Sequence, residues 1–165
     1  MTLIRHFTKP QFVQPILSDG IINKERSNSF EKQEKSMKDY YGEVVPMSRE
    51  AKEANIRGNN FLSSVIGDFV WFTEERFANT ALPKVMLPTA KDLYFEFDSE
   101  EIGAIKWHHF KKRFTEETAL SVIRVMDKAA KLVGDNPYCY WISESAVPIA
   151  LAKPKGIMLP IREAA

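Results

Sequence analysis

Residues 3–22 read LIRHFTKPQFVQPILSDGII and predict a short strand followed directly by a helix. Leu3–Phe7 is a short apolar run, and Lys9-Pro10 ends it because proline restricts the residue before it and suits a first helical turn. The Arg5-His6 pair inside this run is not what a core strand needs. A ligand site at a strand-to-helix turn would account for it.

The helix of this unit has recognisable signals along its length. Its apolar side chains recur at helical spacing, at Phe12, Val13, Ile16 and Leu17. Thr8 is a candidate N-cap, and Asp19-Gly20 is typical of a helix end. Pro15 stands inside the pattern and is expected to kink or shorten the helix.

Further strands are expected where apolar and aromatic residues cluster between turn signals. These predicted strands are Asp68–Thr73, Leu93–Asp98, Tyr138–Ser143 and an edge strand at Ile157–Ile161. Ile105–Phe110 carries no clear pattern. The order of strands and helices favours an α+β fold over a doubly wound one, because no glycine-rich phosphate turn follows the first strand.

Three further helices are expected. Ser48–Ile56 predicts a short one, and a second begins at Glu74 with Thr73 as its cap and acidic residues in its first turn. The strongest pattern covers Thr115–Val133, where Gly134 and Pro137 mark the end. Residues 23–60 are mostly polar and of mixed charge, and we expect them to form an insertion or lid beside a cleft.

Composition limits the classes of function. The chain has 165 residues, enough for one domain at 1–165, and its formal net charge of +1 gives no global attraction to nucleic acid or anionic membrane. With one cysteine, Cys139, an internal disulfide framework is excluded and a zinc site is disfavoured, so we expect no metal. The sequence shows neither a signal-peptide pattern nor a membrane-span pattern, which favours a cytoplasmic protein.

Three strand ends carry polar or aromatic groups on apolar runs. They are His6 in LIRHFT, Trp71 to Thr73 in FVWFTEE, and Glu144 in YWISESAVPI. Each alone has an ordinary structural explanation: a half-exposed strand histidine, core aromatic residues and a surface carboxylate. Considered together and in this order along the chain, the three strand ends form a recognisable pattern.

The set resembles the ADP-ribosyltransferase superfamily, whose members have a split, mainly antiparallel sheet around an NAD cleft. LIRHFT with the following helix and glycine looks like the first motif of that family. GDFVWFTEERFANTAL looks like the second motif, and YWISESAVPIALAKPKGI like the terminal one, in which a glutamate precedes a Val-Pro turn. The resemblance implies an NAD-dependent transferase, acting as a toxin, a phage effector or a regulator, with a protein or nucleic-acid acceptor.

The resemblance also implies roles for individual residues. Glu144 would stabilise the oxocarbenium-like charge at the nicotinamide ribose, and His6 would hold the adenosine ribose. Trp71 or Phe72 would stack on nicotinamide. Thr8, Thr73 and the backbone of Phe7 would form hydrogen bonds to the carboxamide or the ribose. Arg5 or Arg26 would neutralise the pyrophosphate.

Other hypotheses stay open. A relative with the same fold could hydrolyse NAD or remove an RNA 2′-phosphate, and a non-catalytic module could bind a partner through residues 23–60. Trp107–Arg113 is a basic and aromatic cluster that suits a nucleic-acid phosphate and a stacked base, although a solvated helix start with one buried tryptophan is the more common origin of such a pattern. Cys139 is expected to be a buried strand residue without a nucleophilic role.

Overall fold

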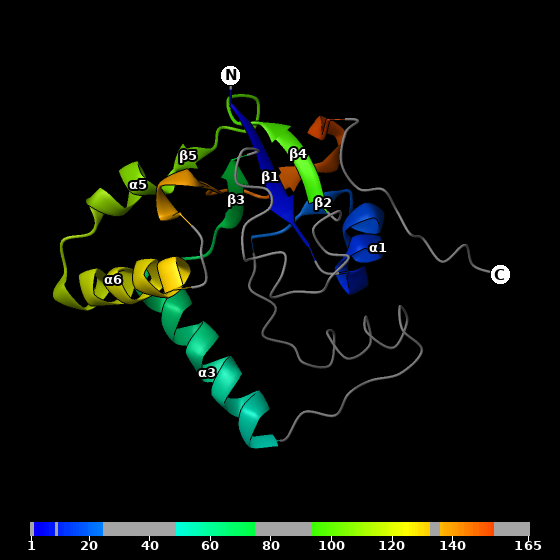
Figure 1. Cartoon of the computed structure of the whole chain (residues 1–165). Helices are drawn as coiled ribbons and strands as arrows, with labels where there is room; N and C mark the ends of the chain where they lie inside the picture. Colours follow the sequence, from blue (N-terminus) through cyan, green and yellow to red (C-terminus); the bar gives the residue numbers. More distant parts are fainter. Residues whose placement is uncertain (1, 9, 25–48, 75–93, 133–135, 154–165) are drawn as a thin grey trace.

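The computed structural model of the chain describes residues 2–8, 10–24, 49–74, 94–132 and 136–153, and it is an α+β fold (Figure 1). Its larger sheet has five strands in the order β4-β1-β3-β6-β5, and every neighbouring pair is antiparallel. The strands are β1 (Leu3–Phe7), β3 (Val70–Glu74), β4 (Tyr94–Asp98), β5 (Ile105–Lys106) and β6 (Tyr140–Ser143). A second antiparallel sheet pairs β2 (Ile21–Ile22) with β7 (Val147–Pro148).

Helices and short 3-10 turns cover the larger sheet. The helices are α1 (Pro10–Asp19), α3 (Arg49–Val65), α5 (Trp107–Phe110) and α6 (Glu117–Leu132), and the turns are η3 (Lys111–Arg113), η4 (Pro137–Cys139) and η5 (Ile149–Leu151). α3, α5 and α6 gather on one side of the molecule, while α1 and the small sheet lie on the other (Figure 1).

Each face of the sheet has its own hydrophobic core, because successive side chains of a strand point to opposite faces. On one face, the central strands pack with β2, β7 and α1. The buried members of this core are Ile4, Ile22, Val70, Phe72, Phe95, Phe97, Trp141 and Val147. On the other face, the sheet packs under α5 and α6 around Ile66, Trp107, Phe110, Ile123 and Ile142.

The first strand-to-helix unit agrees closely with the sequence pattern. β1 occupies Leu3–Phe7, and α1 begins at Pro10 and ends before Gly20, whose backbone φ of 71° is readily available only to glycine. Gly20 N–H donates to the Ile16 carbonyl at 2.9 Å and so closes the last turn. Of the two effects expected of Pro15, a kink or a shorter helix, the second does not occur, because α1 continues through it to Asp19.

α6 and β4 also confirm their predictions, whereas two predicted boundaries are wrong. Thr73 does not cap a helix, because β3 continues through it to Glu74. Tyr138 is not a strand residue, since Pro137–Cys139 forms a 3-10 turn in which the Asn136 side chain accepts from Tyr138 N–H. Cys139 is therefore buried in a turn and not in a strand.

The helix predicted at Ser48–Ile56 begins at Arg49 but runs on to Val65. Gly58 and the asparagines after it have low helix propensity, so the sequence favours an earlier end. Packing overrides that preference, because Val65 and the following Ile66 join the core under α5 and α6. Part of the proposed 23–60 insertion is thus a regular helix, and its other segment, 25–48, lies outside the described residues.

Several predictions fall outside the described part of the chain: Arg26, the helix from Glu75 onward and the edge strand at Ile157–Ile161. Among the helices within the described ranges, none has the length and apolar character needed to cross a membrane.

Candidate functional site

A row of four side chains crosses the larger sheet on the face that carries α6. Glu96 on β4 stands directly opposite Arg5 on β1, which stands opposite Thr73 on β3. Thr73 in turn stands opposite Tyr140 on β6. Directly opposed residues of antiparallel strands point to the same face, so a carboxylate, a guanidinium, a hydroxyl and a phenol lie side by side.

A cavity of about 290 Å³ lies against this row. Its walls combine polar groups of the row with aromatic and thioether side chains, and the lining consists of Arg5, His6, Phe7, Trp71, Phe72, Thr73, Met126 and Tyr140. The volume is at the lower end of the range for small-molecule pockets, and a mainly apolar wall with a few polar groups is typical of such pockets. β1 and β3 supply most of the lining, and α6 supplies Met126.

Arg5 is held in place at the edge of the cavity. Its Nε donates to Glu96 Oε2 at 2.9 Å, and both side chains are buried. The guanidinium carbon lies 4.0 Å from the centre of the Tyr94 ring, a cation–π contact from the strand that carries Glu96. A buried charge needs such partners, because desolvation would otherwise cost several kcal/mol. The contacts therefore fix the position of one positive charge in the cavity wall.

Thr73 contributes a buried hydroxyl to the wall. The residue is 3% exposed, and its Oγ1 has no hydrogen-bond partner within the described ranges of the chain. Leaving a buried polar atom unpaired costs about 1–3 kcal/mol. Since Thr73 lines the cavity, a bound molecule with a donor or acceptor at this point would remove that cost.

His6 is half-buried and its Nδ1 lies 2.8 Å from the Trp71 carbonyl oxygen. A carbonyl oxygen only accepts, so Nδ1 carries the proton and Nε2 keeps its lone pair in the neutral ring. Burial lowers the pKa of His6 below its ordinary value, and the bond to Trp71 only partly opposes this effect. His6 is therefore neutral at pH 7, with Nε2 as a hydrogen-bond acceptor.

The structure brings most of the sequence-predicted residues together, but on two faces. Arg5, Phe7, Trp71 and Thr73 belong to the face with the row, where Trp71 packs on Trp107 at 4.9 Å between ring centres. The rings of His6 and Phe72 lie together on the opposite face, with 5.8 Å between their centres. His6 and Phe72 still border the cavity, because His6 is next to Arg5 and Phe7 on β1 and Phe72 is next to Trp71 and Thr73 on β3.

Glu144 and Thr8 do not line the cavity. Glu144 follows β6 directly, is exposed, and its carboxylate lies 3.4 Å from Arg113 Nη1. Its backbone carbonyl accepts from Lys24 Nζ at 3.3 Å. Ile142, two residues earlier, stands opposite Trp71, so Glu144 lies roughly 7 Å further along the strand from that cavity residue. Thr8 follows β1 and is buried.

Sequence reasoning missed three residues of this region, namely Met126, Tyr140 and Glu96. Met126 and Tyr140 fit core patterns of a helix and a strand, and nothing local separates a core residue from a cavity wall. Glu96 had a signal in the alternation of LYFEFD, which places Tyr94, Glu96 and Asp98 on one face of β4. Glu96 and Asp98 are nevertheless buried, which marks this face as more than a solvated surface.

Comparison of the chain with protein-family models, with curated proteins and with solved structures finds no match in any of the three. Among the described residues, no group of three or more histidine, cysteine or acidic side chains is placed to hold a metal ion. The cavity and the groups around it are therefore the features that point to a function.

Proposed function

We propose that this chain is an NAD-dependent ADP-ribosyltransferase that transfers ADP-ribose from NAD to a macromolecular acceptor. The observation that carries the proposal is the cavity over β1 and β3, whose lining includes the aromatic, hydroxyl and guanidinium groups assigned to NAD from the sequence. The three segments that resemble the family motifs contain β1, β3 and β6, and these are neighbours in one antiparallel sheet although they are far apart in sequence. This arrangement supports a common site.

In this proposal the cavity takes the nicotinamide end of NAD. An aromatic wall suits the pyridine ring, and the Thr73 hydroxyl suits its carboxamide, which offers both a donor and an acceptor. A volume of about 290 Å³ is too small for the whole dinucleotide, so the ribose and the phosphates extend out of the cavity. Trp71 stands opposite Ile142 on β6, and Glu144 follows the end of β6. A ligand that extends from Trp71 toward that strand end approaches Glu144.

The reaction is a displacement at the ribose. The C1′–N bond to nicotinamide breaks, and nicotinamide leaves with the bonding electron pair. An oxygen or nitrogen of the acceptor forms the new bond to C1′ and gives up its proton to the Glu144 carboxylate. The same carboxylate stabilises the positive charge that develops on the ribose in the transition state. With water as the acceptor, the same steps amount to NAD hydrolysis.

A second candidate function is ligand binding without catalysis. Its specific support is the position of Glu144, whose carboxylate is exposed, pairs with Arg113 and lies outside the cavity lining. Calorimetry with NAD and a nicotinamide-release assay separate the two functions. NAD binding with nicotinamide release supports the transferase, and NAD binding without release supports ligand binding without catalysis. Absence of NAD binding overturns both uses of the cavity.

Thr73→Val is the sharpest variant for the cavity, because it replaces a hydroxyl by a methyl group of similar size. We expect NAD affinity to fall about tenfold, since the carboxamide loses its partner. We also expect the free energy of unfolding of the unliganded protein to rise by about 1 kcal/mol, because an unpaired buried hydroxyl is removed. Unchanged NAD affinity in Thr73→Val would contradict the placement of nicotinamide.

A further inference from the structure

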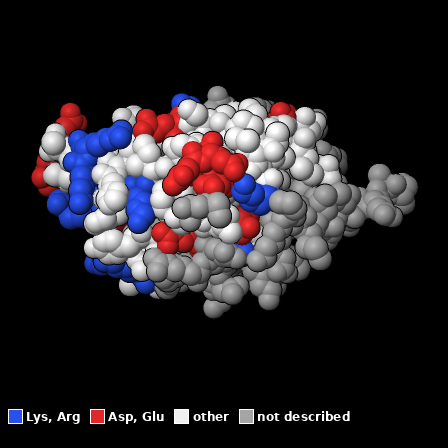
Figure 2. Space-filling model, turned by 90° about the horizontal axis from the view of Figure 1, so that it is seen from above, with Lys and Arg blue, Asp and Glu red and all other residues white. Residues whose placement is uncertain are grey.

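A basic patch lies on the side of the molecule that carries α5 and α6. Of the eight residues Lys106–Arg113, six have basic side chains. We define the basic patch as His109, Lys111, Lys112, Arg113 and Tyr138, the last contributed by η4, which packs against α5. Figure 2 shows lysine and arginine side chains gathered on this side, with a few acidic ones beside them.

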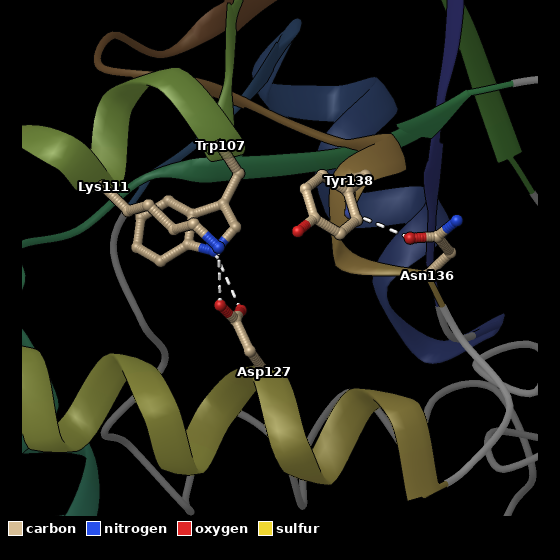
Figure 3. Close-up of polar contacts among 5 residues, drawn as sticks. All are labelled: Trp107, Lys111, Asp127, Asn136 and Tyr138. Carbon is tan, nitrogen blue, oxygen red and sulfur yellow. Dashed lines mark hydrogen bonds and ion pairs between the residues drawn. The ribbon is translucent and has the colours of Figure 1, made fainter.

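The patch stands on a rigid support. Asp127 on α6 accepts from Trp107 Nε1 at 3.1 Å and from Lys111 Nζ at 2.8 Å (Figure 3). Trp107 is 1% exposed, so one carboxylate ties a buried ring and a cation to α6. Lys111 is thereby placed by two elements, which lowers the entropy that it would lose on binding an anion.

Tyr138 presents its ring to solvent in a fixed position. The residue is 56% exposed, and the Asn136 side chain accepts from its backbone N–H at 3.1 Å (Figure 3). One side of the ring packs on His108, with 4.6 Å between ring centres, and Lys111 Nζ lies 5.6 Å from the ring centre. An exposed aromatic ring beside a cation is an arrangement on which unpaired bases stack.

Positive charge in the patch exceeds the negative charge that faces it. Asp127 is engaged with Lys111, and Glu144 with Arg113 in an exposed pair at 3.4 Å. Lys112 is exposed and makes no ion pair with any residue in the described ranges. Partial burial and the charges of Lys112, Lys111 and His109 lower the pKa of His108, in keeping with a positive local potential.

We infer that the basic patch binds single-stranded nucleic acid, with a base stacked on Tyr138 and phosphates held by the lysines and Arg113. Phosphate contacts by lysine and arginine give affinity without sequence preference, and stacking favours a strand whose bases are unpaired. The charge of the patch is opposite to that of the backbone. The exposed Tyr138 ring favours single-stranded nucleic acid over other polyanions, because other polyanions have no base that could stack on it.

The patch adjoins the candidate cavity. Met126 lines the cavity while the next residue, Asp127, supports the patch. Trp71 in the cavity wall packs on Trp107, which Asp127 also holds. If the proposed transferase function is correct, the strand on the patch is the acceptor. Strand binding itself is inferred from the patch alone and does not need NAD.

The test measures binding of a fluorescently labelled, mixed-sequence single-stranded oligonucleotide by anisotropy, in the absence of NAD, at several salt concentrations. We expect Tyr138→Ala to weaken binding about tenfold, whereas Tyr138→Phe keeps the ring and binds like wild type. Lys112→Ala should weaken binding and reduce the steepness of the salt dependence by about one. Arg57→Ala, at an exposed cation of α3, is the matched control and should leave both unchanged.

Three results would overturn the inference. The first is absence of binding by the wild type at low salt. The second is equal binding by Tyr138→Ala and wild type, which would leave a general polyanion surface. The third is binding to vesicles of anionic phospholipid that outcompetes the oligonucleotide. Because no arm uses NAD, failure here leaves the proposed transferase function to its own test.

Discussion

Two arginine–glutamate pairs occupy opposite environments in this molecule. Arg5 and Glu96 lie 2.9 Å apart, with side chains 10% and 3% exposed, whereas Arg113 and Glu144 lie 3.4 Å apart, with side chains 60% and 49% exposed. In a buried pair each charge depends on the other, because water cannot replace a lost partner. In an exposed pair water replaces the partner readily, so the bond contributes little. The buried pair therefore contributes to stability, whereas exposure leaves the Glu144 carboxylate able to turn toward a ligand.

Glu96→Gln tests the buried pair and carries the largest expected effect. The change keeps the size of the side chain but leaves the Arg5 guanidinium without its counter-charge. We expect the free energy of unfolding to fall by about 3 kcal/mol, measured by denaturant titration. The double variant Arg5→Met with Glu96→Leu removes both charges and should recover most of this loss. A single variant as stable as wild type would show that other contacts of Arg5 carry its charge.

Glu144→Gln tests the exposed pair in two measurements. Nicotinamide release should fall about a hundredfold, as expected for loss of a charge that stabilises the transition state. NAD affinity should change much less, because the interaction strengthens as charge develops. The free energy of unfolding should stay within about 0.5 kcal/mol of wild type. A large loss of stability with normal turnover would reverse the roles of the two pairs.

The buried pair also shows which features the sequence alone predicts and which it does not. The apolar run at Leu3–Phe7 and the long pattern at Thr115–Val133 predict their elements, because local periodicity reports which face is buried. Local pattern does not report which strands become neighbours. Arg5 and Glu96 are 91 residues apart, and only the pairing of β1 with β4 makes Glu96 a buried partner in place of a surface carboxylate.

The candidate site, too, is predicted only in part by the sequence. Motif order draws attention to β1, β3 and the end of β6, but it does not show that His6 and Phe72 point away from the face of Thr73. It also does not separate Glu144, beyond the strand end, from the cavity. Strand register decides both, and register depends on contacts across the sheet.

His6 lies between the two pairs in burial, and its effect on stability should lie between theirs. Its pKa is lowered by burial from 6.5 in the unfolded chain. Below pH 6.5 the unfolded state binds the proton first, so stability is full above that pH and is lost as pH falls toward the lower folded pKa. The slope reaches at most about 1.4 kcal/mol per pH unit. Denaturant titrations between about pH 7.5 and 5 should show a shallower loss in His6→Gln than in wild type.

Arg113→Ala is expected to have the smallest effect, and it sharpens the comparison most directly. It removes the partner of Glu144 and keeps the carboxylate, so it separates the pair from the charge. We expect the free energy of unfolding to change by less than about 0.5 kcal/mol, and nicotinamide release to stay within about threefold of wild type, because an exposed ion pair holds neither side chain firmly. Both are measured beside Glu144→Gln in the same assays. If Arg113→Ala instead lowers turnover as far as Glu144→Gln does, Arg113 positions the carboxylate, and the exposed pair is a working part of the site.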